Sequence, residues 1–197
     1  MSDTTTHTER RATGLAQRPK RADARRNYEK LLEAASAAFT DHGTAASLED
    51  IARRAGVGIG TLYRHFPTRQ ALLEAVYVDE VEEMSAKAND LAHLDPWEAL
   101  VTWLRQFVRY AATKRALADE MLNSIDAEAP VFVSCRAAIT EAGDMLLQRA
   151  QDAGEARKDT NFTDVGRMVA GIASIRTADP GQIDRILDMA LDGLRAR

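Results

Sequence analysis

Residues 47–76 read SLEDIARRAGVGIGTLYRHFPTRQALLEAV, and this stretch decides the fold. The hydroxyl of Ser47 can cap the first turn of a short helix, which Gly56 then ends. The turn at 56–58 leads into a second short helix, which stops at Pro67 because proline biases the preceding residue away from helical backbone. Two short helices joined by a glycine-containing turn are typical of a helix-turn-helix, which presents a helix to the major groove of DNA.

The second of these helices, at about 59–66, has a face suited to DNA. If its apolar residues face the core one turn apart, the outward residues are Gly60, Thr61, Tyr63 and Arg64. Arg64 can donate to guanine or to a phosphate, Thr61 can contact thymine, and Tyr63 can donate to a phosphate oxygen. Gly60 lets the backbone approach closely. A helical hairpin with a solvated polar face is the alternative interpretation.

The same stretch resembles the DNA-binding signature of the TetR/AcrR family, approximately hydroxyl-x-x-x-I-A-x-x-A-G-V-S-x-G-T-L-Y-x-H-F-x-x-K-x-x-L, and nearly every fixed position is present. The resemblance implies an all-α fold in which a three-helix DNA-binding domain is joined by a long helix to a C-terminal helical domain for ligand binding and dimerisation. It covers about the first 80 residues. Beyond them only length, helicity and the C-terminal helix pair agree.

The resemblance implies a set of DNA contacts in the helix-turn-helix: Ser47, Gly60, Thr61, Tyr63, Arg64, His65 and Arg69. Arg69 occupies the family's basic position at the start of the long helix, where it would clamp a phosphate. His65 is equally well interpreted as a packing residue, because its helical angle lies near that of Leu62. Two positions depart from the family pattern. Gly58 stands where serine is common, and Ile59 stands where a polar residue is frequent, so we expect Ile59 to pack inward or to meet a thymine methyl.

The charge is distributed unevenly along the chain. Residues 1–77 carry 12 basic and 9 acidic residues, a net charge of +3, whereas the remainder carries 14 and 21, a net charge of −7. This asymmetry is expected when one segment meets phosphates. Residues 1–26 are polar and predict a flexible basic arm, with order beginning near Asn27. We expect four of its residues to lie in a minor groove, with a solvated tail as the alternative: Lys20, Arg21, Arg25 and Arg26.

Helical periodicity and its interruptions predict about nine helices in two packed parts, with no convincing strand. We expect them at about 27–42, 48–55, 59–66, 69–91, 95–113, 115–124, 129–153, 163–175 and 181–194. The DNA-binding domain is expected at 27–74, and the ligand-binding and dimerisation domain at 75–197.

The last two predicted helices are candidates for a dimer interface. One short reading helix contacts too few base pairs to define a genomic site, so we expect a homodimer on a palindromic operator. The resemblance implies that these helices pair with their mates as a four-helix bundle, and packing within one subunit is the alternative. The expected interface residues are Val165, Met168, Val169, Ile172, Ile183, Ile186, Leu187 and Leu191.

The middle helices carry large apolar side chains that could line a cavity for a small-molecule effector. Ordinary core is the alternative for each of them. The candidate pocket residues are Trp103, Phe107, Tyr110, Met121, Phe132 and Met145.

Composition excludes several classes of protein. The chain of 197 residues is 45% hydrophobic and 28% charged, as in a globular protein. No apolar run approaches the ~20 residues that cross a bilayer, so we expect a cytoplasmic protein without membrane contact. A single cysteine, Cys135, excludes an internal disulfide, and its apolar flanks favour a packed thiol over a redox sensor. The four histidines lack ligand spacing, so neither a metal nor a cofactor is expected.

Together these patterns predict a sequence-specific transcriptional regulator, a repressor that leaves its operator when it binds a small molecule. A helix-turn-helix protein without an effector is the alternative. An enzyme is not expected, because no nucleophile–base motif or metal-ligand spacing is present, and the glycine-rich stretch 56–60 follows a helix and not a strand.

Overall fold

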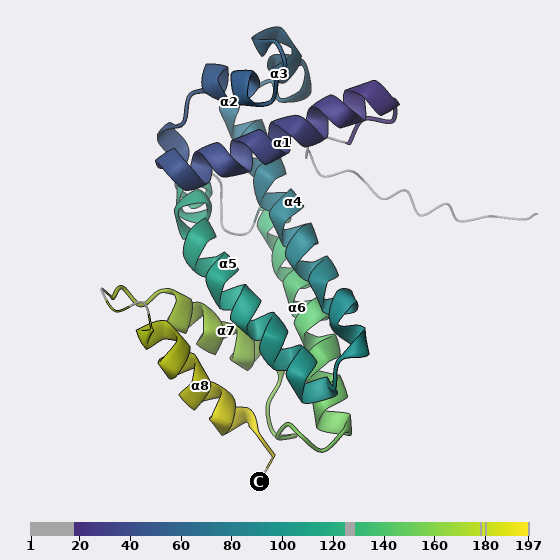
Figure 1. The fold of residues 1–197 in the computed structure, drawn as a ribbon, viewed down its shortest axis with the longest axis vertical. Coiled ribbons are helices and arrows are strands. Elements are labelled where there is room, and N and C mark those ends of the chain that lie inside the picture. Colours follow the sequence, from purple (N-terminus) through teal and green to yellow (C-terminus); the bar gives the residue numbers. More distant parts are fainter. Residues whose placement is uncertain (1–17, 125–128, 178, 180, 197) are drawn as a thin grey trace, which may run out of the picture.

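The computed structural model describes residues 18–124, 129–177, 179 and 181–196. In this part of the chain the secondary structure is helical, apart from one isolated bridge between Ala156 and Arg195. The helices are α1 (Ala22–His42), α2 (Leu48–Arg54), α3 (Ile59–His65), α4 (Arg69–Asp90), α5 (Pro96–Ser124), α6 (Pro130–Asp152), α7 (Phe162–Ala173) and α8 (Gln182–Leu194). Figure 1 shows a head of α1–α3 above a body of α5–α8, with α4 running from one to the other.

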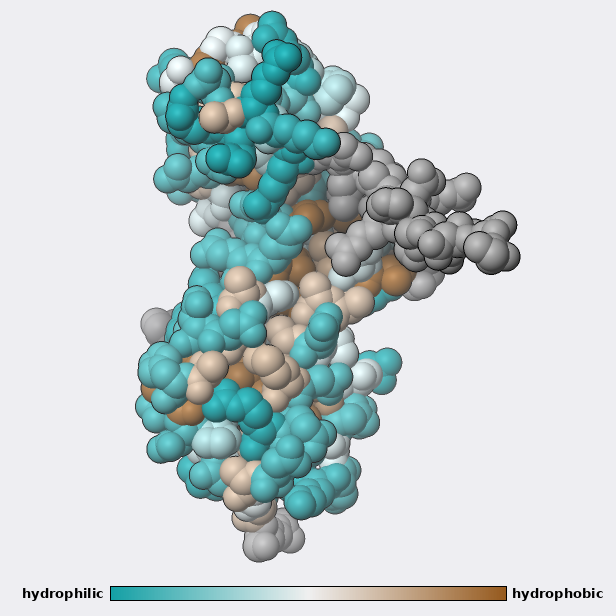
Figure 2. All heavy atoms as spheres, turned by 90° about the vertical axis from the view of Figure 1, so that its right-hand side faces the viewer, coloured by the Kyte–Doolittle hydropathy of each residue, from teal (hydrophilic) through white to brown (hydrophobic). Residues whose placement is uncertain are grey.

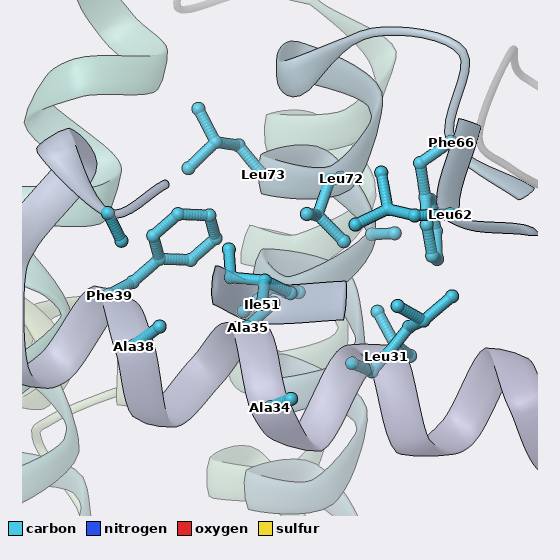
Figure 3. Packing of buried hydrophobic residues seen from close by; sticks show 14 of the residues in the cluster. Leu31, Ala34, Ala35, Ala38, Phe39, Ile51, Leu62, Phe66, Leu72 and Leu73 are labelled. Atoms are coloured by element: carbon cyan, nitrogen blue, oxygen red, sulfur yellow. The ribbon is translucent and has the colours of Figure 1, made fainter. Parts of the chain in front are cut away.

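The head is built around a small apolar core. Leu31 of α1, Leu62 of α3 and Leu72 of α4 are fully buried in one cluster, and Figure 3 shows their side chains pointing toward one another. Burial of each such side chain contributes about 1.5–3 kcal/mol. Because these residues come from three helices, the core fixes the position of α3 relative to α1 and α4.

Local capping sets where α2 and α3 begin and end. The Ser47 hydroxyl accepts a hydrogen bond from the Asp50 amide at 3.3 Å, which satisfies one free N–H group of α2. Gly56 has φ +67°, a left-handed conformation that glycine adopts without strain. The amide of Gly56 donates to the Arg53 carbonyl at 3.1 Å and that of Val57 to the Ala52 carbonyl at 3.0 Å. These two bonds form a Schellman motif and turn the chain sharply into α3.

The body has its own core, to which α4 contributes Met84 and Ala88. Trp103 of α5 is fully buried, and its indole N–H donates to the Met84 carbonyl at 3.0 Å. Since the first turns of α4 pack in the head and its last turns pack in the body, this helix links the two parts mechanically.

Two expectations about the helices are wrong. The predicted break between 113 and 115 is absent, because α5 is continuous from Pro96 to Ser124 and no glycine or proline interrupts it. The described residues therefore hold eight α-helices and not nine. Order also begins earlier than Asn27, because α1 starts at Ala22 with Asp23 in its first turn, where an acidic side chain is favourable. The expected domain boundary at 74/75 lies within α4 and remains a prediction.

Candidate DNA-binding surface

Helix α3 is held by two buried residues and presents a distinct outer face. Leu62 and Phe66 are fully buried, and the Phe66 ring lies 5.0 Å from that of Tyr28 on α1, between ring centroids. Tyr63 is 45% exposed and Ile59 is 38% exposed, so Ile59 does not pack inward. The other residues predicted for this face are placed outward as well: Gly60 and Arg64 are exposed and Thr61 is partly exposed.

His65 is half-buried at the edge of this surface. Its ring meets that of Tyr28 edge-on, with 6.0 Å between the centroids. Burial lowers the pKa of His65 below its ordinary value, and the neighbouring Arg64 charge lowers it further. Of its two interpretations, the structure supports the packing contact, and a DNA contact remains a prediction.

The start of α2 carries an acidic patch that faces solvent. The hydroxyl of exposed Ser47 donates to the Glu49 carboxylate at 2.8 Å, and Asp50 pairs with Arg53 at 2.5 Å. A hydrogen bond from its own backbone amide, followed by that of Ser47, lowers the pKa of Glu49, so the group is charged at neutral pH. Because phosphates avoid a carboxylate, α3 is better suited than the start of α2 to approach the DNA backbone.

Basic residues lie at the start of α4 and immediately before α1. Arg69, the first residue of α4, is partly buried with its guanidinium 5.7 Å from the centroid of the Phe39 ring. Lys20 and Arg21 are exposed immediately before α1. Figure 2 shows that the head is covered mainly by hydrophilic residues on the face it displays.

The predicted basic arm is in part helical, which corrects the expectation for two of its residues. Arg25 and Arg26 lie in the first turns of α1, where Arg25 is 3.8 Å from Glu29 and Arg26 pairs with Asp23. They are therefore placed rigidly by α1 and not by a flexible segment. The part of the arm at 1–17 lies outside the described residues.

Comparison with known proteins places this geometry in a family. Residues 31–76 match the model described as "Bacterial regulatory proteins, tetR family", and residues 95–196 match the model described as "Transcriptional regulator SbtR-like, C-terminal domain". A crystal structure of a TetR transcriptional regulator from Streptomyces coelicolor is 43% identical, with a TM-score of 0.75, covering 85% of this chain and 98% of that one. The chain belongs to the TetR family.

Other relatives agree with this assignment. A TetR transcription regulatory protein from Mycobacterium vanbaalenii is 37% identical, with a TM-score of 0.74, over 90% of this chain and 100% of that one. The repressor KstR of Rhodococcus jostii is 29% identical over 136 residues, 66% of this chain. A regulator of Staphylococcus aureus is 36% identical over 78 residues, 38% of this chain. These two matches span 62% and 40% of the relatives' own lengths. As a TetR-family member, the protein is a DNA-binding transcriptional regulator and not an enzyme.

The body contains a cavity of about 610 Å³, which is lined by residues of α4, α5, α6 and α7. Of the predicted pocket residues, Phe107 and Tyr110 line it. Trp103 and Phe132 are instead core residues, 0% and 4% exposed, because their helices turn them toward the interior. Met145 lies at the surface beside a different hollow that Gln148 and Asn161 also line. The side chain of Met121 lies outside the described residues.

Helix α7 also lines this cavity, which the sequence did not predict. The lining includes Thr163, Gly166, Arg167, Ala170 and Ser174, which recur at helical spacing on one side of α7. Their signal is a stripe of small and hydroxyl residues beside the apolar stripe, but a stripe of this kind is also typical of an ordinary solvated face.

Phe107 and Tyr110 form an aromatic wall of the cavity, and the buried Trp103 stacks on Phe107. The centroids of Trp103 and Phe107 are 5.4 Å apart, and those of Phe107 and Tyr110 are 6.3 Å apart, with the rings nearly parallel in both pairs. Burial raises the pKa of Tyr77 to about 12 and that of the Cys135 thiol to about 11, and both residues line the cavity. Both shifts follow first from burial of the two side chains. The raised pKa keeps Cys135 protonated, as expected for a packed thiol.

Most predicted dimer residues are used inside the subunit, which corrects the expectation. Five of them are 0–7% exposed because α7 and α8 pack against their own core: Val165, Val169, Ile172, Leu187 and Leu191. Met168, Ile183 and Ile186 remain partly exposed. A second apolar stripe faces solvent, with Met189 67% and Ile175 39% exposed. That α7 and α8 form a dimer interface remains a prediction, and it now concerns these exposed apolar residues.

Within the described residues no helix combines the length and apolarity needed to cross a membrane. The same part of the chain holds no cluster of three or more histidine, cysteine or carboxylate side chains arranged to bind a metal ion.

Proposed function

We propose that the protein is a cytoplasmic repressor that binds a palindromic operator as a homodimer and is released when a small molecule occupies the body cavity. The observation that carries the proposal is the outer face of α3, which lies opposite the buried Leu62 and Phe66. A short, rigid helix with an exposed polar face fits the major groove.

Side-chain chemistry supports direct contacts from α3. Arg64 can donate two hydrogen bonds to a guanine edge or pair with a phosphate, and Tyr63 can donate to a phosphate oxygen. Ile59, exposed at the first position of α3, can contact a thymine methyl. Arg69 at the start of α4, and Lys20 and Arg21 before α1, supply phosphate contacts beside it.

The outer faces of α7 and α8 support dimerisation. Met168 of α7 is partly exposed, Ile175 just beyond the end of α7 is exposed, and Met189 of α8 is exposed. Gly171 and Gly193 share these faces, and a Cβ atom added at either would meet nothing within 4 Å. Exposed apolar side chains beside glycines allow two helix pairs to approach closely, so a four-helix bundle between two copies buries surface that is otherwise costly to expose.

The position of α4 supports release by a ligand. Tyr77 and Val81 of α4 line the cavity, whereas Leu72 and Leu73 pack in the head. A ligand that binds better when α4 is displaced will shift the population toward a conformer whose two heads no longer match successive major grooves. By linkage, operator DNA must weaken ligand binding by the same factor.

Selection of bound fragments from random DNA tests the proposal. The expected result is a twofold-symmetric sequence whose half-sites lie about one helical turn, or a multiple of it, apart. A screen for small molecules that raise the melting temperature then supplies effectors, which must weaken operator binding. Failure to enrich any sequence contradicts the proposal. An operator that no stabilising molecule weakens shows instead a regulator without an effector.

A further inference from the structure

The body cavity has an uneven distribution of charge. Arg136 of α6 and Arg167 of α7 both line it, and no aspartate or glutamate of the described residues does. Both arginines are exposed, so they lie where the cavity meets solvent. A positively charged rim without a carboxylate attracts an anion and repels a cation.

Hydroxyl groups accompany the arginines. Thr140 lies one turn beyond Arg136 on α6, and Thr163 and Ser174 lie one and two turns from Arg167 on α7. The hydroxyls of Thr140 and Thr163 can donate a hydrogen bond to an oxygen of a bound ligand, whereas that of Ser174 donates to the Gly171 carbonyl at 2.7 Å. Guanidinium groups with neighbouring hydroxyl donors are well suited to a carboxylate, because the planar guanidinium matches its two oxygens.

The inner end of the cavity has the opposite character. Phe107 and Tyr110 present rings stacked nearly parallel, with Ile139 and the protonated Cys135 across from them. These groups provide a flat and largely apolar surface. An anionic group placed here would lose its hydration without compensation, whereas an aromatic or other flat apolar group would be favoured.

We propose that the effector is an anionic amphiphile, a flat apolar body bearing one carboxylate, whose carboxylate binds Arg136 and Arg167 and whose body lies against Phe107 and Tyr110. This inference rests on the proposed function, since it names the class of molecule that occupies the effector cavity. The cavity volume of about 610 Å³ lies within the range of ordinary ligand pockets, about 300–1,000 Å³. Because the arginines lie at the rim, the carboxylate keeps part of its hydration while the body is buried.

Calorimetric titration of the full chain without DNA tests the ligand class directly. The probes are 2-naphthoate and its neutral isostere 2-naphthamide, which share a flat body and differ in charge. We expect the acid to bind about tenfold more tightly or better, as is typical when a charge-assisted hydrogen bond replaces a neutral one. The variant Arg167→Gln is expected to remove most of this preference, and Arg136→Gln to reduce it. The matched control Arg176→Gln, which changes an exposed arginine outside the cavity lining, is expected to keep it.

The outcomes separate this inference from the proposed function. Equal binding of acid and amide, loss of preference in the Arg176→Gln control alone, or no saturable binding of 2-naphthoate up to millimolar concentration overturns the anionic class. Circular dichroism confirms that each variant is folded before it is scored. If the acid binds through Arg167 but leaves the affinity for the selected operator unchanged, the ligand class stands and release by an effector fails.

Discussion

Replacement of Gly143 by alanine tests how the body cavity is built. A Cβ atom at Gly143 on α6 would lie 2.1–2.4 Å from three atoms of the Phe162 ring, well inside contact distance. Phe162 begins α7, is 2% exposed, and packs edge-on against Trp103 with 5.7 Å between centroids, so its ring has little room to move. Overpacking of this kind typically costs about 1–3 kcal/mol. The gain in helix propensity from glycine to alanine offsets at most about 1 kcal/mol.

Gly143→Ala is therefore expected to lower the free energy of unfolding by about 1–2 kcal/mol. At about 2–4 °C per kcal/mol, the melting temperature should fall by several degrees. Calorimetry at fixed protein concentration measures it. The matched control is Gly60→Ala on α3, where an added Cβ meets nothing within 4 Å and stability should be unchanged or slightly higher. The second change Phe162→Leu, which removes the clashing ring edge, should make Gly143→Ala less costly. A Gly143→Ala protein as stable as the wild type would refute this packing.

Three further expectations concern the turn, the titration of the head and the dimer. Gly56→Ala should lower the free energy of unfolding by about 1–2 kcal/mol because φ is +67° there. Gly58→Ala should lower it much less, because φ of Gly58 is −70°. Equal chemical denaturation midpoints of the two variants would contradict this. Because the pKa of His65 is lowered in the folded protein, the unfolded chain binds a proton at a higher pH than the folded one. The free energy of unfolding should therefore fall as the pH drops below about 6.5. His65→Gln should make the free energy of unfolding, measured by urea titration, depend less on pH. Met189→Glu should yield monomers in sedimentation, whereas Met145→Glu, at an exposed site on α6, should not.

The head could be predicted closely because its signals are local. The Ser47 cap, the Gly56 turn and Pro67 lie within one stretch, and each acts on its immediate neighbours. The burial of Leu62 and Phe66 follows from helical spacing alone, and it determines which residues of α3 face outward.

The body could not be predicted as closely because its arrangement depends on contacts between distant residues. Helix α7 buries Val169 but leaves Met168 partly exposed, and only the packing of α7 against α5 and α6 decides which of its apolar residues face the core. The Phe162 ring of α7 packs directly against Gly143 of α6. Helical periodicity within one segment cannot reveal such a contact between two helices. The continuity of α5 is different, because the absence of glycine and proline from 112–118 was already visible in the sequence.

The outer face of α3 is expected to bind operator DNA. Gel-shift titration of the selected operator with Tyr63→Ala and Arg64→Ala tests it most directly, with Lys158→Ala, an exposed change in the body, as the control. Loss of a base or phosphate contact in both half-sites should weaken binding about tenfold or more for each α3 variant, while folding and dimerisation stay intact. Wild-type affinity of both α3 variants would contradict the account.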